Sequence, residues 1–146
     1  MNGYVMVGTN DLTSAKKFYD KLLNVLNIKA IYSDDVCIGY ANDGSDDVEF
    51  YVTKPANGEP ATYGNGTQVS FLTKTRAQVV EFHKTGLDLG GKNEGDPGLR
   101  PNDGDVYYSY VRDLEGNKIC AYTNSCLLYT SPSPRDVEES RMPSSA

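Results

Sequence analysis

Apolar residues recur at two different spacings along this chain, and the two spacings alternate in the same order twice. Between residues 15 and 26 they recur every three or four positions, which is typical of one buried face of a helix. The flanking segments alternate or stay apolar over short runs, which is typical of strands. The first part of the chain is therefore predicted to form a strand, a helix and three strands, at 4–8, 13–26, 28–33, 36–41 and 48–53.

The same order returns after a connector at 55–66 that is rich in Gly, Pro and Asn. It begins with a strand at 68–73 and a helix at 75–87. One short strand is expected inside the Gly-rich segment 90–105, and strands follow at 106–112 and 118–123. The chain is thus predicted to be one α+β domain, residues 1–124, built from two β-α-β-β-β modules at 1–58 and 64–124.

Residues 126–146 show no such periodicity and are rich in Ser and Pro, which predicts a disordered tail. Codons for 126–136 and for 140–146 can be written as two parts of a transposon-based sequencing adapter, in one frame and with room for an index between them. We interpret residues 125–146 as a disordered, non-native tail, read from a metagenomic insert into adapter.

Charge, hydropathy and cysteine content limit which partners and which cellular compartment are expected. The formal net charge is −6, so no basic surface that follows a phosphate backbone is expected, and no nucleic-acid partner. No apolar run reaches the length of a membrane span and no signal peptide opens the chain, so no membrane partner is expected either. The three cysteines form neither a disulfide framework nor a zinc motif, which favours the reducing cytoplasm.

Two motifs carry a resemblance to a known family. They are Thr-Asn-Asp-Leu at 9–12 with Phe-Tyr-Asp-Lys-Leu-Leu at 18–23, and Tyr-Val-Arg-Asp at 110–113 with Gly-Asn-Lys at 116–118. Together they resemble the vicinal oxygen chelate superfamily, which includes glyoxalase I, extradiol dioxygenases and the fosfomycin and bleomycin resistance proteins. The chain is most similar to its small glyoxalase-like bacterial members. The resemblance implies a curled eight-stranded mixed sheet with helices on the convex face and a small-molecule cup inside.

The resemblance also places the family's metal ligands. Metal-dependent members use His on the first strand, His or Gln on the fifth and Glu on the last, and the matching positions here are Tyr4, Gln68 and Cys120. These three side chains should converge on one inward-facing patch. The divalent metal of the family is held by imidazole and carboxylate donors, which these three residues do not provide. We therefore expect no metal and no other cofactor, and leave the catalytic residues unassigned; the facing of Glu49 is left open.

Strand alternation predicts which side chains face the cup. Aromatic walls with phenol hydroxyls suit a flat or amphipathic ligand, with ordinary sheet-core tyrosine as the alternative. Tyr107 should face away from the cup. The candidate ligand-binding residues are Tyr4, Gln68, Ser70, Arg100, Tyr108, Tyr110, Cys120 and Tyr122.

Several chemically reactive residues can also be interpreted as structural, and for each we either favour the structural role or keep both roles open. Arg100 either holds a carboxylate or phosphate of the ligand or forms a loop salt bridge with Asp103 or Asp105. His83, the single histidine, is expected to be a helix-surface or half-buried residue and not a general base. Cys120 is expected to be an inert packing residue and not a nucleophile. The Arg112, Asp113 and Asn117 turn is interpreted as structural.

Three functions compete. The favoured one is a protein that binds a small molecule in the cup without a catalytic metal. The second is a metal-dependent lyase or isomerase of glyoxalase type with an altered site, which would require unusual roles for Cys120, Gln68 or Glu49. The third is a non-catalytic dimeric interaction module, and a homodimer is compatible with all three.

Overall fold

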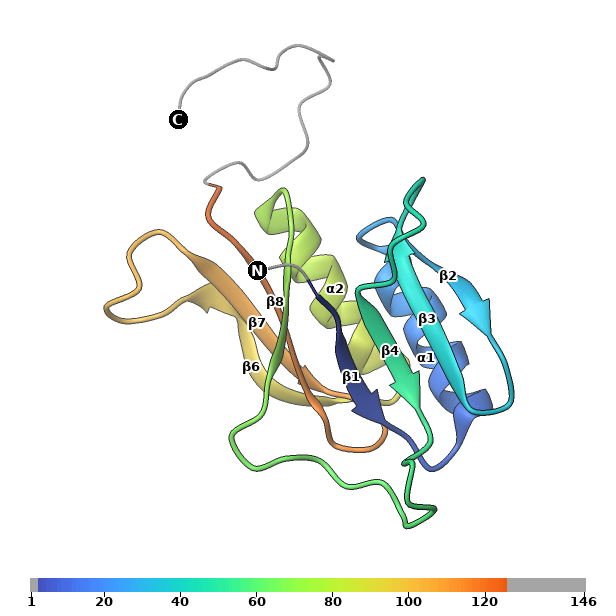
Figure 1. Ribbon diagram of the computed structural model, residues 1–146. Helices are drawn as coiled ribbons and strands as arrows, with labels where there is room; N and C mark the ends of the chain where they lie inside the picture. The colour runs from blue at the N-terminus through green and yellow to red at the C-terminus, as the bar shows by residue number, and fades with distance from the viewer. Residues whose placement is uncertain (1–2, 126–146) are drawn as a thin grey trace.

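The computed structural model describes residues 3–125 and contains two halves of the same construction (Figure 1). The expected tail at 126–146 lies outside the described residues. The first half comprises β1 Val5–Gly8, α1 Leu12–Asn24, β2 Ile28–Ser33, β3 Cys37–Asn42 and β4 Phe50–Thr53. The second comprises β5 Val69–Leu72, α2 Arg76–Asp88, β6 Lys92–Leu99, β7 Tyr107–Arg112 and β8 Lys118–Thr123. The predicted β-α-β-β-β order is confirmed in both halves.

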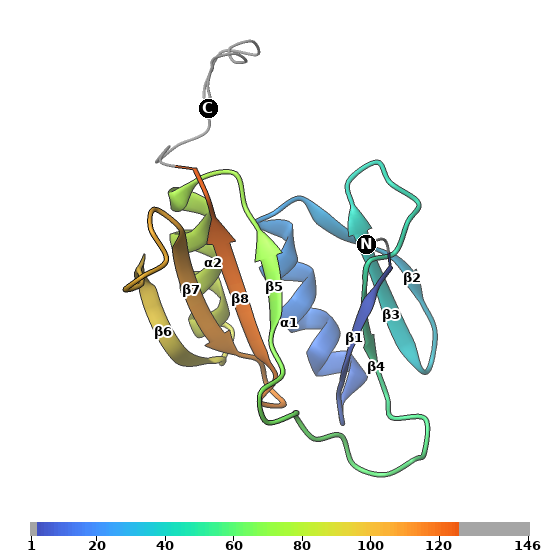
Figure 2. The ribbon, with the colours of Figure 1, turned by 60° about the vertical axis from the view of Figure 1, so that its left-hand side comes forward.

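Each half builds a four-stranded mixed sheet. The strand orders are β1-β4-β3-β2 and β5-β8-β7-β6, and the first strand of each half pairs in parallel with the last strand of that half. The other neighbouring strands are antiparallel. The α+β fold class is confirmed, with the eight strands divided between two hydrogen-bonded sheets. The edge strands β1 and β5 face each other across the middle of the molecule (Figures 1 and 2).

Both helices begin where the sequence places a capping side chain, and both lie on the same side of the sheets (Figure 2). The Asp11 carboxylate accepts from the Ser14 backbone N–H at 3.1 Å, and the Thr75 hydroxyl accepts from the Gln78 N–H at 3.2 Å. No helix within residues 3–125 is long and apolar enough to cross a membrane. The buried residues of α1 recur at helical spacing: Ala15, Phe18, Tyr19, Leu22 and Leu23.

One apolar core joins the halves even though their sheets are separate. The ring of Phe50 on β4 lies 5.3 Å, centroid to centroid, from the ring of Phe71 on β5. Phe71 in turn lies 6.1 Å from Phe82 of α2. Leu22 of α1 is 0% exposed in the same core. The two modules are therefore packed together through their helix-facing side chains.

The strand expected to be short and poorly marked, β6, is eight residues long. Its pairing with β7 shifts register twice, and Gly95 lies at both shifts. A Cβ atom at Gly95 would lie 2.6 Å from the Tyr110 ring, so glycine lets the β6 backbone pass close over that ring. A strand interrupted by glycine and proline has no apolar alternation, which is why the pattern underestimates its length.

Candidate functional site

The two sequence motifs meet at the junction of the halves. Asp113, buried in the turn between β7 and β8, accepts hydrogen bonds from the Tyr19 hydroxyl of α1 and from the Asn117 N–H and Nδ2 at 2.8 and 2.9 Å. The Asn117 Nδ2 also donates to the Gly8 carbonyl at the end of β1, at 3.1 Å. Burial, helped by the Asp113 carboxylate, raises the pKa of Tyr19 well above its ordinary value, so this phenol is a neutral donor.

A second set of contacts fastens the same two turns together. The Glu115 carboxylate accepts from the Thr9 hydroxyl at 3.1 Å and from the Asn10 N–H and Nδ2 at 2.7 and 2.9 Å. The Asn10 side chain also exchanges hydrogen bonds with the backbone of Ala61 in the connector. These contacts agree with the structural interpretation of the turn motif, and they explain why two segments so far apart in sequence belong to one signature.

Polar and aromatic side chains gather on the face of the second sheet that points away from α2. Cys120 lies opposite Ser70 on one side and Tyr110 on the other, and Tyr108 lies opposite Tyr122. The Gln68 Nε2 donates to the Ser70 hydroxyl at 2.9 Å. We call this group the tyrosine face; its residues are Gln68, Ser70, Tyr108, Tyr110, Cys120 and Tyr122.

The three phenol rings of the tyrosine face form a ladder. Tyr108 and Tyr110 have centroids 5.9 Å apart and planes inclined by 11°, and Tyr108 and Tyr122 have centroids 6.1 Å apart and planes inclined by 24°. Tyr107 lies on the opposite face, where the Arg76 guanidinium stands 5.0 Å from its ring centroid. The facing predicted for these tyrosines by strand alternation is therefore confirmed.

Two cationic side chains reach the ladder at Tyr110. The Arg100 guanidinium carbon lies 5.1 Å and the Lys118 Nζ 4.9 Å from the ring centroid. Arg100 donates to the backbone carbonyls of Leu99 and Asp96, at 3.3 and 2.8 Å. It does not form the loop salt bridge that was its alternative role, and across residues 3–125 neither cation has an acidic partner within ion-pair distance.

Burial governs the titration of the tyrosine face. Cys120 is fully buried, and desolvation raises the pKa of its thiol, opposed in part by its hydrogen bond with Ser70 and by the nearby Lys118 and Arg100 charges. Desolvation likewise raises the pKa of Tyr110. At neutral pH the face therefore presents a protonated Cys120 thiol beside the neutral phenols of Tyr108 and Tyr110, which supports packing and hydrogen bonding by Cys120 in place of nucleophilic attack.

Tyr4 belongs to a different group, in the first half. It is 63% exposed, and its ring meets that of Tyr51 edge to face at a centroid distance of 5.0 Å. Both tyrosines line a hollow with Glu49, which answers the open question about that carboxylate: it shares a side with Tyr4 and Tyr51. The remaining lining residues are Gly3, Asp46, Asp47 and Val48.

The positions equivalent to the family's metal ligands do not fit a divalent metal. Ser70 links Gln68 to Cys120, whereas Tyr4 contacts Tyr51 of the first sheet. The donors are a phenol, an amide and a thiol whose pKa burial raises, without imidazole or carboxylate. No group of three or more His, Cys, Asp or Glu side chains in the described part of the chain is arranged to hold a metal ion.

His83 is more deeply buried than a helix-surface or half-buried residue, at 6% exposure, because α2 packs it against β6. Its Nε2 lies 2.9 Å from the Asn93 Oδ1, which satisfies one ring nitrogen. The helix carries it on the side of the second sheet opposite the tyrosine face. This placement agrees with a packing role and not with general-base chemistry at that face.

Comparison with known proteins defines the class. The family model described as Glyoxalase/Bleomycin resistance protein/Dioxygenase superfamily matches residues 3–121, and the chain belongs to this family. A glyoxalase/bleomycin resistance protein from Albidiferax ferrireducens T118 is 41% identical, with a TM-score of 0.76 over 86% of this chain and 99% of the other.

Two more distant structures share the fold. A glyoxalase-related enzyme from Fulvimarina pelagi is 15% identical, with a TM-score of 0.67 over 85% of this chain and 88% of the other. A lactoylglutathione lyase from Agrobacterium tumefaciens is 18% identical, with a TM-score of 0.59 over 85% and 93%. Comparison with curated proteins finds no match.

Sequence reasoning missed Lys118. It stands two residues before Cys120 on β8, so alternation alone places it on the same face as Cys120 and Tyr122. Alternation was therefore sufficient to identify Lys118. It was overlooked because it belongs to the turn motif, which was interpreted as structural.

Proposed function

We propose that this protein binds a small organic molecule on the tyrosine face without a resident catalytic metal. The observation that carries the proposal is the ladder of Tyr108, Tyr110 and Tyr122 beside the hydrogen-bonded pair of Gln68 and Ser70. Small-molecule sites combine aromatic walls with a few polar groups that set orientation, and this face offers both. The Tyr108 and Tyr110 phenols are neutral, so they can donate hydrogen bonds to a ligand as well as accept them.

Ligand binding can be tested by a fragment screen monitored through the tyrosine ring resonances of labelled protein. Binders should shift Tyr108, Tyr110 and Tyr122 together, and Tyr110→Leu should remove the binding. Tyr63→Leu is the matched control, because Tyr63 also has a cation 5.4 Å from its ring centroid, Arg112, but lies in the connector. Binders that ignore Tyr110→Leu and respond to Tyr63→Leu would contradict the proposal.

The metal-free part of the proposal rests on the chemistry of the donors, and it has its own test. Purified protein should carry no stoichiometric nickel, zinc, iron or manganese, and a chelator should leave its melting temperature unchanged, because a bound metal would stabilise the folded state. Turnover of hemithioacetals should be absent. One equivalent of tightly held metal, or turnover that a chelator removes, would favour the glyoxalase-type enzyme instead.

We further propose a cytoplasmic location. Cys37 and Cys120 are both free thiols, and unpaired cysteines persist in reducing compartments. Fractionation of the native host should therefore recover the protein with the cytoplasmic markers, and recovery from an oxidising compartment would contradict this.

We also propose a homodimer. Val5 and Met6 on the edge strand β1 leave 47% and 50% of their surface exposed, and Leu72 on the edge strand β5 leaves 61%. Strand alternation places Val5 and Val7 on the same face of β1, yet of the two only Val7 is buried. A second chain over these apolar edge residues would bury them. Sedimentation at micromolar concentration should show a dimer that Met6→Glu dissociates; a wild-type monomer would refute it.

A further inference from the structure

The tyrosine face has two cationic side chains beside it that form no ion pair within residues 3–125. Three cationic side chains lie on or beside it, but only Arg112 has an acidic partner, with its Nε 3.2 Å from the Glu94 carboxylate. Arg100 and Lys118 instead contact the Tyr110 ring. In a chain with a formal net charge of −6, two cations left beside a half-buried aromatic surface indicate charge complementarity to an anion.

The nearest acids do not cancel this charge. Glu94 is occupied by Arg112, whose hydrogen bond and charge lower the pKa of the Glu94 carboxyl, with a smaller effect from Lys118. Asp103 is close enough to influence the Tyr108 and Tyr110 phenols but pairs with no cation. It acts on the same two phenols as Arg100, but as one carboxylate beside two cations it leaves the charge around Tyr110 positive.

The geometry of the ladder specifies the shape of the ligand. With planes inclined by only 11° and 24°, the three rings present parallel faces and edges, so a flat ring that lies parallel to them continues the stack. A guanidinium or ammonium group beside the same ladder forms charge-assisted hydrogen bonds with an anionic group such as a carboxylate. The corresponding hollow of the first half, lined by Asp46, Asp47 and Glu49, would repel that anion.

We propose that the ligand of the tyrosine face is a planar aromatic carboxylate, with its ring parallel to the ladder of Tyr108, Tyr110 and Tyr122 and its carboxylate beside Arg100 and Lys118. This inference rests on the proposed function, because it names the class of molecule bound at that same face. It assigns Arg100 and Lys118 as the specificity-determining residues.

Four probes of similar size separate charge from planarity. They are 2-naphthoate, its neutral analogue 2-naphthylmethanol, its cationic analogue 2-naphthylmethylammonium and the non-aromatic anion decahydro-2-naphthoate. Titration followed by tyrosine ring resonances should show 2-naphthoate binding about tenfold or more tightly than the neutral and cationic analogues, since one charge-assisted contact is worth at least that factor. It should also bind about threefold or more tightly than decahydro-2-naphthoate, which keeps the carboxylate but cannot stack. The affinity for 2-naphthoate should fall as salt is raised.

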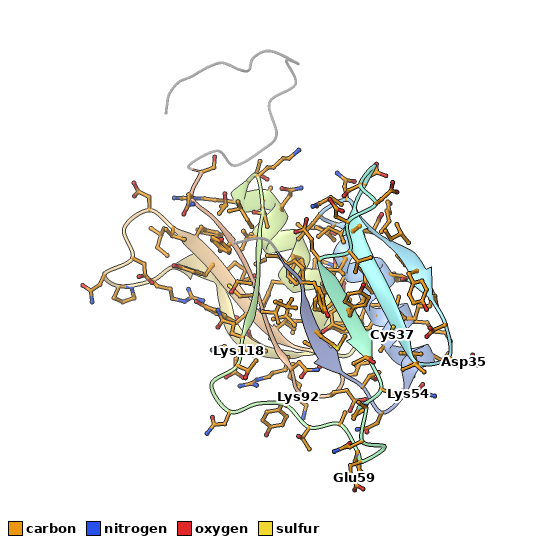
Figure 3. All side chains as sticks on the ribbon, viewed as in Figure 1. Asp35, Cys37, Lys54, Glu59, Lys92 and Lys118 are labelled. Carbon is orange, nitrogen blue, oxygen red and sulfur yellow. The ribbon has the colours of Figure 1, made fainter. Side chains whose placement is uncertain are left out.

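Charge-removing variants locate the effect. Arg100→Gln and Lys118→Gln should each weaken 2-naphthoate about tenfold and leave 2-naphthylmethanol unchanged. Lys54→Gln is the matched control, because Lys54 is an exposed lysine on the first half whereas Lys118 lies on the second (Figure 3). Melting temperatures within experimental error of wild type confirm that the variants are folded.

The outcomes distinguish the two proposals. If the neutral or cationic probe binds the tyrosine face as well as 2-naphthoate, the carboxylate class is wrong and the binding function stands. If decahydro-2-naphthoate binds as tightly as 2-naphthoate, the aromatic requirement is wrong. If Arg100→Gln and Lys118→Gln weaken binding no more than Lys54→Gln, the assignment of these residues is wrong. If no probe and no screened fragment shifts Tyr108, Tyr110 and Tyr122, both proposals fail.

Discussion

The two halves of the molecule have the same strand order and opposite chemistry on their exposed sheet faces. In the first half, Tyr4 and Tyr51 meet edge to face beside the carboxylates of Asp46, Asp47 and Glu49. In the second half, three stacked tyrosines adjoin two cations that have no acidic partner in the described residues. The difference shows that the repeated topology supplies the scaffold, and that a few side chains on each face decide what the face can bind.

On the opposite side of the sheets the halves are alike and depend on each other. Helix α1 fills the core with Leu22 and Leu23, helix α2 fills it with Val79 and Phe82, and all four belong to one cluster. The exposed faces are therefore free to differ, because stability comes from the shared core and from the turns that join the halves.

The largest loss of stability should follow from shortening a side chain in that shared core. Leu22→Ala removes a fully buried side chain and should lower the free energy of unfolding by about 2–5 kcal/mol, because a cavity remains between helix and sheet. Leu72→Ala is the matched control on a residue that is 61% exposed, and it should cost about 0.5 kcal/mol or less. Urea unfolding measures both; equal costs would contradict the burial of Leu22 in this core.

The junction between the halves should give the next largest effect. Asp113→Ala would leave the Tyr19 hydroxyl and the Asn117 N–H as buried donors without their acceptor, at a cost of about 2–4 kcal/mol. Asp88→Ala, which breaks an exposed ion pair with Lys84, should cost less than about 1 kcal/mol. If the two changes cost the same, the motif's hydrogen bonds do not hold the halves together.

The free energy of unfolding should depend on alkaline pH through Tyr19 at the same junction. Because burial raises the pKa of Tyr19 in the folded state, Tyr19 contributes stability that is present below its ordinary pKa of about 10 and is lost as pH rises above it. In the folded protein it keeps its proton, whereas the unfolded chain loses it. Tyr19→Phe should therefore reduce the alkaline slope of unfolding free energy by up to about 1.4 kcal/mol per pH unit. Urea unfolding between pH 8 and about 11 measures the slope, and an unchanged slope would contradict a buried neutral phenol.

The elements of the fold follow from local pattern, whereas the relation between the halves does not. Helical spacing locates both helices within two residues of their observed starts and ends. Alternation orients Tyr107 and Tyr108 correctly because it depends only on neighbouring residues. The bond from Tyr19 to Asp113 spans 94 positions, and no local pattern specifies such a partner.

In the candidate site too, local pattern predicted which residues of one strand share a face but not which segments come together. Alternation groups Gln68, Ser70, Cys120 and Tyr122 on one face, and the strand registers then bring Tyr108 and Tyr110 beside them. The environment of Arg100 depends on the irregular strand β6, whose glycines break the alternation that would predict it. The grouping of Tyr4 with Tyr51 depends on how the first half is paired, which sequence spacing alone does not reveal.

The smallest expected effect decides whether the two exposed faces form one site or two. Glu49→Gln removes a carboxylate from the first-half hollow, and it should change the free energy of unfolding by no more than about 0.5 kcal/mol because Glu49 is exposed. If the tyrosine face binds alone, affinity for 2-naphthoate should change less than about twofold at physiological salt, where charges more than about 8 Å apart in solvent are largely screened. Titration of wild type, Glu49→Gln and Lys118→Gln in parallel measures this contrast. A large gain in affinity from Glu49→Gln would place the carboxylate near the bound anion, and the ligand would then lie between the halves, as a cup shared by both modules requires.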